Sequence, residues 1–363
     1  MSAPRLEIHL EHLQHNATTL VNRLGRQGIQ VSGVSKATLG MPEIVRTWVA
    51  AGVQSIGESR IESIEALGRC ELGVPLLLIR SPMLSQVDRV VAHAAISCNS
   101  EAVVLRALAA AAHCQGVRHG VLLMVELGDL REGILAADLE AMVLLTLALP
   151  SLRLVGIGTN LGCQNGVAPD QSNMSELSRL MDALEGRFGI RLDWCSGGNS
   201  ANLPWLASGG DPGRINHLRL GEALLLGREP LTGTAIPGLH TDAITLVAEV
   251  IECKHKPTRA WGTRHRTSFA KEPASSQEQP EQPMALRALL ALGEQDADPA
   301  GLSSPGISIE GASSDHLVVG GAVSALSVGD EQRFEVSYSC LLRAMTSPFV
   351  SRYFIEALDR SDC

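Results

Sequence analysis

The segment VSGVSKATLGMPEIVRTWVAAGVQSIG, residues 31–57, contains one complete strand–helix–strand unit. Val31–Ser35 and Ser55–Gly57 are short apolar runs typical of buried parallel strands. Pro42–Ala51 between them is helical in character, and Pro42 suits a first helical turn because an N–H there would have no partner. The alternation continues to about Gly227, with further strands expected at Leu76–Arg80, Ile96–Asn99, Val121–Leu127, Leu152–Thr159, Leu192–Ser196 and His217–Leu220.

Eight such alternations predict an α/β fold, a (β/α)8 TIM-type barrel, because eight parallel strands close a barrel. We place the barrel at residues 11–230 and expect residues 1–10 to form a strand that pairs with a second domain. After about Arg228 the sequence changes to short β runs separated by Gly, Ser and Asp, which predicts a C-terminal all-β domain at residues 231–363. A polar, proline-containing loop is expected at residues 254–284.

The composition limits the classes of function. With 45% hydrophobic and 19% charged residues, the 363-residue chain has the composition of a globular protein. Its 39 acidic and 30 basic residues give a net charge of -9, which argues against binding to nucleic acid or anionic membranes. No apolar run approaches the roughly 20 residues of a membrane span, and Met1–Glu11 has no secretory pattern. The cysteines do not have the spacing of metal ligands, so we expect no metal site. Without a secretory pattern, and with cysteines that we expect to be reduced thiols, we expect a cytoplasmic protein.

Active sites of TIM-type barrels lie where the strands end, and Lys36 ends the first strand. A neutral lysine amine is a nucleophile for carbonyl carbons, which makes Lys36 a candidate for covalent catalysis. The alternative is a lysine whose ammonium extends to the barrel rim while its stem packs against apolar residues.

Other polar groups follow the later strands. Two turns, Ser196–Ala201 and Leu220–Ala223, contain glycine and lead into helices, so their backbone N–H groups suit a phosphate. For the first turn the alternative is an ordinary turn with a helix cap. Arg131 follows the strand that ends near Leu127, and Arg219 lies within the last strand, where an unpartnered guanidinium would be costly. An amine for an aldehyde, a phosphate cradle and two cations together describe a site for pyridoxal 5'-phosphate (PLP).

The chain resembles the alanine racemase-like family of PLP enzymes, and within it the ornithine racemase group. Members of that family combine an N-terminal (β/α)8 barrel with a C-terminal β domain. The resemblance rests on phrases that run in order along nearly the whole chain: Val34–Lys36, Gly128–Gly133, Ser196–Ser200, Leu218–Glu222, Leu226–Glu229 and Gly311–His316.

The resemblance implies a role for each matching residue. Lys36 would bond to the cofactor's aldehyde carbon, and Arg219 would face the pyridine nitrogen without protonating it, since arginine stays charged. Arg131 would contact the phenolic oxygen and the substrate, and Asn160 would replace a ring-stacking histidine. The remaining cofactor contacts implied by the resemblance are Asn199, Ser200, Gly221, Glu222 and the C-terminal Tyr338, which we expect on a strand.

The second catalytic base is the main departure from the family pattern. Racemisation removes a proton on one face of Cα and returns it on the other. Alanine racemases use a tyrosine of the partner subunit for one face; here Glu294 stands at that point, and the chain has only two tyrosines, Tyr338 and Tyr353. Glu294 is therefore a candidate second base, a ligand for a cationic side chain or a turn carboxylate. Asp315 is a further catalytic candidate, and Ser314, Asp315 and His316 are candidates for substrate binding.

We therefore expect a PLP-dependent amino-acid racemase whose partner is a small molecule, an amino acid, with a basic one such as ornithine or lysine suited to the acidic candidates. The resemblance implies a homodimer whose sites are completed in trans. Two alternatives remain: a non-racemising PLP enzyme, such as a lyase or decarboxylase, and a PLP-binding homeostasis protein without turnover. Relatives of the last kind consist of the barrel alone, which the long C-terminal domain here does not match.

Overall fold

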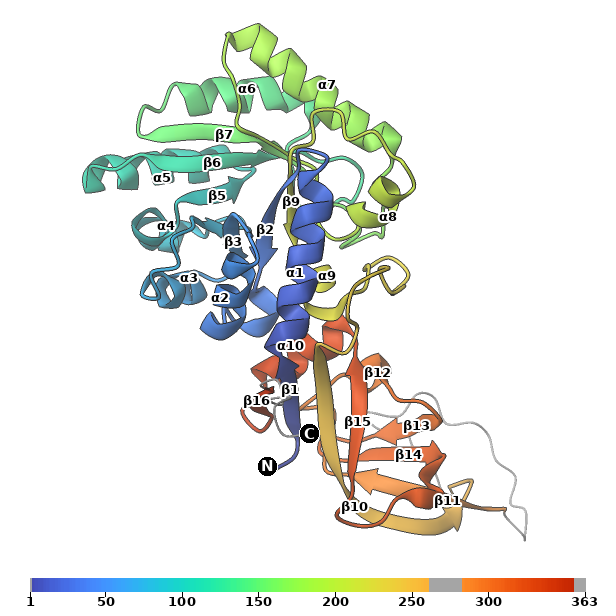
Figure 1. Ribbon diagram of the computed structural model, residues 1–363. Coiled ribbons are helices and arrows are strands. Elements are labelled where there is room, and N and C mark those ends of the chain that lie inside the picture. Colours follow the sequence, from blue (N-terminus) through green and yellow to red (C-terminus); the bar gives the residue numbers. More distant parts are fainter. Residues whose placement is uncertain (1, 261–282, 356–363) are drawn as a thin grey trace, which may run out of the picture. The chain divides into compact units, whose positions relative to one another are not determined.

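The computed structural model describes residues 2–260 and 283–355, which form two compact units. Residues 10–240 form the barrel unit, and the described residues on either side of that range together form the β unit (Figure 1). The boundary thus lies at His240 and not at residue 230. Residues beyond 230 stay with the barrel because Ile236 N donates to Gly227 O at 2.8 Å and Asn16 Nδ2 donates to His240 O at 2.9 Å.

The barrel consists of eight parallel strands, each hydrogen-bonded to the next, and β9 closes the ring on β2. This confirms the (β/α)8 architecture predicted from the sequence. In order the strands are β2 (Gln30–Val34), β3 (Ser55–Glu58), β4 (Leu76–Leu78), β5 (Ile96–Asn99), β6 (His119–Met124), β7 (Leu152–Gly158), β8 (Trp194–Ser196) and β9 (His217–Leu220).

Each barrel strand is followed by a helix that buries its apolar side. In the second helix Trp48 is fully buried, and a Cβ at Gly33 of β2 would lie 2.8 Å from its ring, so glycine at this position makes room for the indole. The helices are α1 (Leu10–Gly25), α2 (Pro42–Ala50), α3 (Ile61–Gly68), α4 (Val87–His93), α5 (Ala102–Gln115), α6 (Ala136–Leu147), α7 (Gln171–Phe188), α8 (Asn202–Ala207) and α9 (Glu222–Leu226), with short 3-10 turns η1 (Lys36–Thr38) and η2 (Leu84–Gln86).

The inside of the barrel is partly polar. His217 lies between two serines, with Nε2 2.7 Å from Ser32 Oγ and Nδ1 2.8 Å from Ser196 Oγ. Trp194 stacks on the same imidazole at 4.0 Å between ring centroids. Burial lowers the pKa of His217 well below its usual value, so the ring is neutral in the folded protein.

The β unit is built around β10 (Ile244–Pro257), whose first half pairs with β1 (Arg5–His9) and β15 (Glu331–Val336). Arg5 and Glu7 of β1 are buried, and Arg5 donates to Glu331 of β15 at 2.6 Å, so a charged pair connects the two strands that flank β10. The remaining elements are β11 (Met284–Leu290), β12 (Leu302–Ser303), β13 (Ile307–Ala312), β14 (Leu317–Gly321), β16 (Ser351–Ile355), the helix α10 (Tyr338–Thr346), and the 3-10 turns η3 (Pro299–Gly301) and η4 (Val323–Ala325).

Two expectations for the β unit were wrong in detail. Lys254–Pro257 is not loop but the end of β10, paired with the start of β11, and Glu252 forms ion pairs with Lys254 and Lys256 along this exposed strand. Tyr338 is not on a strand; it opens α10, which begins there because Ser337 caps the helix by accepting from Cys340 N at 3.3 Å. Residues 261–282 of the expected polar loop lie outside the described residues. Within residues 2–260 and 283–355, no helix combines the length and apolar character needed to span a bilayer.

Candidate active site at the carboxyl ends of the barrel strands

Lys36 lies directly after β2, on a backbone corner held by several hydrogen bonds. The carbonyl of Ser35 accepts from Thr38 N at 2.9 Å and Gly40 N at 3.2 Å. Leu39 takes a left-handed conformation with φ +55° to complete the turn. Lys36 itself is half-buried. The structure therefore fixes the start of this side chain at the carboxyl end of the barrel, where the sequence placed it.

Glu58 ends the neighbouring strand, β3, and was not among the site residues predicted from the sequence. Its side chain is buried, with 1% of the residue exposed, and Ser35 Oγ donates to Glu58 Oε1 at 2.7 Å. Burial raises its pKa to about 7, against the opposing effect of the Ser35 hydrogen bond. The available signal was an acid that ends an apolar strand, which is the same pattern that singled out Lys36.

The glycine-containing turns after β8 and β9 lie next to each other. Ser200, 2% exposed, accepts from Ala223 N through its Oγ at 3.2 Å, and Gly198 O accepts from Arg219 N at 2.9 Å. Gly221 is the N-cap of α9, and a Cβ there would lie 3.2 Å from Val34 O. Glycine thus lets this turn pack closely against the backbone of β2.

Glu222 follows Gly221 and is the second carboxyl with a pKa raised to about 7, through burial first and repulsion from Glu229 second. A charged carboxylate would repel a phosphate. The raised pKa of Glu222 favours its neutral form, which together with the backbone N–H of this residue makes the position compatible with an anion.

Arg219 is a buried guanidinium inside the barrel mouth, with 4% of the residue exposed. Its Nη2 donates to Thr159 O at 2.6 Å, and its Nη1 donates to Ser196 Oγ. Burial lowers its pKa below the usual range for arginine. These contacts supply the partners that a buried arginine requires.

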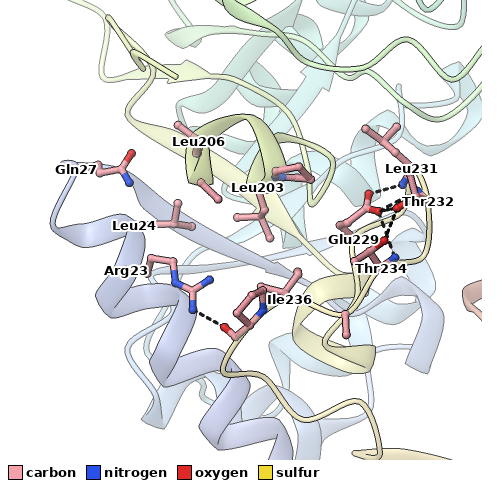
Figure 2. Close-up of a pocket in the computed structure, with 14 residues that line it drawn as sticks. Arg23, Leu24, Gln27, Leu203, Leu206, Glu229, Leu231, Thr232, Thr234 and Ile236 are labelled. Carbon is pink, nitrogen blue, oxygen red and sulfur yellow. Dashed lines mark hydrogen bonds between the residues drawn. The ribbon is translucent and has the colours of Figure 1, made fainter. Parts of the chain in front are cut away.

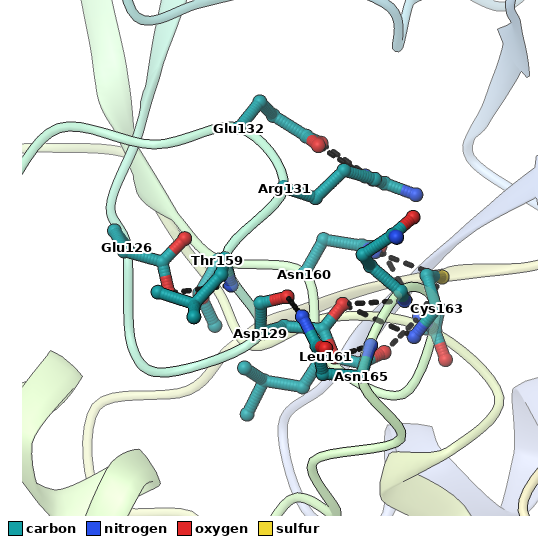
Figure 3. Close-up of polar contacts among 12 residues, drawn as sticks. Glu126, Asp129, Arg131, Glu132, Thr159, Asn160, Leu161, Cys163 and Asn165 are labelled. Carbon is teal, nitrogen blue, oxygen red and sulfur yellow. Dashed lines mark hydrogen bonds and ion pairs between the residues drawn. The ribbon is translucent and has the colours of Figure 1, made fainter.

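The loops after β6 and β7 are joined through Asp129, which is 1% exposed (Figure 3). Its Oδ2 accepts from Gln164 N at 2.9 Å, and Asn165 Nδ2 donates to its backbone carbonyl at 2.6 Å. Burial alone would raise the pKa of Asp129, but backbone N–H donors from residues 163, 164, 165 and 167 outweigh it and lower the pKa.

Asn160 and Arg131 lie on these two loops (Figure 3). Asn160 Nδ2 donates to Cys163 Sγ at 3.0 Å, and its Oδ1 accepts from Asn199 Nδ2 at 3.1 Å. Arg131 forms an ion pair with Glu132, which holds the pKa of Arg131 above its usual range. A hydrogen bond thus connects Asn160 with Asn199, whereas the Arg131 side chain pairs with the adjacent residue, Glu132.

The candidates Glu294, Ser314, Asp315 and His316 form a second group, which lies on two adjacent turns of the β unit. Glu294 N donates to Ser313 O at 2.8 Å, and Gln295 N donates to Ser314 O at 3.0 Å. Glu294 Oε2 accepts from Arg343 Nη1 at 2.7 Å. The hydrogen bond from His316, at 2.9 Å, lowers the pKa of the exposed Asp315 carboxyl. Glu294 also lines a cavity of about 1020 Å³ whose other acidic members are Asp298 and Glu310.

A separate apolar cavity of about 340 Å³ lies on the outside of the barrel, between α1, α8 and residues 229–237 (Figure 2). Arg23 Nη2 donates to Pro237 O there at 2.8 Å, and Glu229 Oε2 accepts from Leu231 N at 2.7 Å. Its lining within the described chain does not include Lys36 or Arg219, so it is not the predicted site.

The barrel residues fit PLP by the chemistry of the groups present. A lysine on a fixed corner, a buried guanidinium and a glycine-containing turn at the start of a helix suit the cofactor's aldehyde, ring nitrogen and phosphate respectively. The position of this turn beside Lys36 depends on Gly221, because a Cβ there would lie 3.2 Å from Val34 O.

Comparison with known proteins identifies relatives over nearly the full length of the chain. Lysine racemase of Thermotoga maritima is 35% identical over 357 residues, covering 98% of this chain and 99% of that protein. Ornithine racemase of Acetoanaerobium sticklandii is 35% identical over 354 residues, covering 96% and 99%. Among solved structures, alanine racemase of Streptomyces coelicolor has the same fold, with a TM-score of 0.74 at 20% identity over 97% of both chains. The family model of the alanine racemase N-terminal domain matches residues 8–229. The chain therefore belongs to the alanine racemase family.

Proposed function

We propose that this protein is a PLP-dependent racemase whose substrate is a basic amino acid, with ornithine and lysine as the first candidates. Racemase activity and the PLP cofactor follow from membership of the family. The basic substrate rests on one observation, the similarity over nearly the full length to a lysine racemase and an ornithine racemase. The acidic cavity that includes Glu294 is consistent with a cationic side chain.

The barrel residues divide the work of binding and positioning. Lys36 would bond to PLP, Arg219 would face the ring nitrogen, and the turn that contains Ser200 and the backbone of Gly221 and Glu222 would hold the phosphate. Asn199 and Asn160 would lie against the ring, and Arg131 would contact the phenolic oxygen and the substrate carboxylate. Tyr338 would reach the phosphate region from the β unit.

Bound PLP withdraws electrons from Cα of the substrate and so makes its proton removable. Lys36, released when the substrate's amine takes its place, would hold that proton on Nζ on one face. Glu294 or Asp315 would exchange a proton on the opposite face, with Ser314 and His316 near the substrate. Arg219 remains charged and gives up no proton, which favours simple removal and return of the Cα proton.

We further propose a cytoplasmic homodimer in which the β unit of each subunit completes the partner's site. The dimer is supported by the position of Glu294, which stands in the sequence where the family's base from the partner subunit is expected.

The decisive experiment incubates the PLP-loaded protein with L-ornithine, L-lysine, L-arginine, L-alanine and L-serine, followed by chiral chromatography. We expect D-ornithine or D-lysine to form fastest, together with deuterium uptake at Cα in D2O. Loss of the amino acid to a decarboxylated or cleaved product would instead identify a lyase or decarboxylase. Binding of PLP without any turnover would identify a homeostasis protein.

A further inference from the structure

Glu58 is a buried carboxyl that the mechanism above does not use. It is the last residue of β3, which pairs with β2 so that Gly57 lies opposite Val34. Glutamates are seldom this buried unless they are paired or hydrogen-bonded. Glu58 therefore lies one strand away from Lys36, at the same end of the barrel, in an environment that requires partners.

The partners of Glu58 lead directly to Lys36. Ser35 Oγ donates to Glu58 Oε1 at 2.7 Å, and Ser59 N donates to Oε2 at 3.1 Å, so each carboxyl oxygen accepts a hydrogen bond. Ser35 is itself fully buried, and its N donates to Gly57 O at 3.1 Å. Because Ser35 immediately precedes Lys36, the carboxyl group helps to fix the backbone from which the lysine side chain starts.

The charge environment of Glu58 also includes Lys36. From β2 it faces the Ser35 hydroxyl and the Lys36 charge, and from its own loop the N–H groups of Ser59 and Arg60. On the β4 side, Ile79 N donates to the backbone carbonyl of Glu58 at 2.8 Å. Burial raises the pKa of Glu58 to about 7, so a small change in nearby charge alters its ionisation near neutral pH. Glu222, which follows β9 on the other side of β2, also has a favourable charge interaction with Lys36.

We propose that Glu58 is a positioning residue for Lys36: it holds the Ser35–Lys36 corner and, in its ionised form, supplies the negative charge that stabilises a positively charged lysine nitrogen. This inference rests on the proposed bond between Lys36 and PLP. In turnover, Lys36 Nζ would accept the proton released when the Cα–H bond breaks, forming a new N–H bond, and bound PLP would supply the electron withdrawal that stabilises the electron pair left on the substrate. The resulting ammonium is the species that a carboxylate at Glu58 favours.

The test compares Glu58→Gln with the unchanged protein, both loaded with PLP and without amino acid. Glutamine retains an acceptor for Ser35 Oγ but removes the charge. We expect the pH midpoint of the absorbance change of bound PLP to fall by about one unit, the usual size of a nearby-charge effect. The matched control is Glu62→Gln, an exposed carboxyl on α3, which should leave the midpoint in place.

Ser35→Ala supplies an independent variant should Glu58→Gln fail to fold. It removes the hydroxyl that joins the two residues, and kcat should fall about tenfold with KM little changed and the pH profile shifted, the scale of one hydrogen bond to a charged group. An unchanged midpoint in folded, PLP-loaded Glu58→Gln, or an unchanged pH profile in Ser35→Ala, overturns the role of Glu58 and leaves the proposed function intact. A wild-type protein that binds no PLP overturns the proposed function instead.

Discussion

The side-chain amide of Asn199 donates to the side-chain oxygen of Asn160 at 3.1 Å and to the backbone carbonyl of Leu161 at 2.9 Å. The turn after β8 and the loop after β7 are therefore joined by one side chain. Two of the proposed cofactor contacts form a preorganised unit, so that little ordering is left to be done on binding.

Asn199→Ala should weaken PLP binding by about tenfold or more, because the two hydrogen bonds to the loop after β7, of about 1 kcal/mol each, are lost together with the one from Ala201 N to Asn199 Oδ1. The dissociation constant can be measured by absorbance titration of the protein with PLP. Asn22→Ala, at an exposed position of α1, is the control and should bind PLP as the unchanged protein does. Equal affinities for the two variants would show that the bridge does not order the site.

Lys36→Ala should abolish covalent attachment of PLP. Purified wild-type protein should be yellow, and borohydride should fix the cofactor to the peptide that contains residue 36, as mass spectrometry can show. Lys254→Ala, which changes an exposed lysine of β10, should label as the wild type does. Labelled cofactor on Lys36→Ala protein would contradict the assignment of this residue.

Asp129→Asn should destabilise the protein at pH 7 by about 1.5–3 kcal/mol, the value of hydrogen bonds to a charged group. The folded-state pKa of Asp129 is lowered, so its contribution is fully present above the unfolded value of about 3.9 and disappears as pH falls through the folded value. Urea unfolding at pH 7 and near pH 3 measures this, and the difference between variant and wild type should shrink at the lower pH. A difference that stays constant would rule out the carboxylate as its source.

Glu294→Gln should slow racemisation by about 100-fold if this carboxyl is the second base, the low end of general-base effects. PLP binding should be retained, because glutamine can still accept from Arg343 Nη1 at the position of Oε2. Asp315→Asn is the parallel variant, since Asp315 is the other candidate. If Glu294→Gln is fully active and Asp315→Asn is not, the role passes to Asp315.

The barrel could be predicted from local sequence because its strands are apolar runs bounded by polar residues. Ile96–Asn99 and His217–Leu220 have the same bounds in sequence prediction and structure. Val121–Leu127 was extended too far, since β6 ends at Met124 and Val125 forms an isolated bridge with Ile134 that closes a loop. That closure depends on a contact across the loop, which a strand pattern does not contain.

The same distinction holds for the candidate site. Lys36 and Arg219 were predicted as site residues because a charged residue in or after a buried strand is conspicuous. Glu58 ends a strand in the same way, but its hydrogen bond to Ser35, 23 residues earlier in the chain, depends on the pairing of the two strands and is not contained in the local pattern. The role of Asp129 in joining two loops could not be predicted for the same reason, because its hydrogen-bond donors Gln164 and Asn165 lie on the next loop. Tyr338 was placed on a strand although Ser337 offered a helix cap.

The pairing of β1 with β10 and β16 has a consequence for biosynthesis. β1 is synthesised before the barrel, but its partners β10 and β16 are synthesised after it, so β1 stays unpaired until the whole barrel has been made. The barrel can close in the meantime, because its strands pair among themselves. Deleting residues 2–9 would leave the hydrogen-bonding edges of both β10 and β16 open and would remove the buried Arg5 and Glu7 charges that contact β15. Along the sequence, the barrel lies between the first strand of the β unit and the rest of that unit, so a short segment before the barrel determines whether the sheet after it is complete.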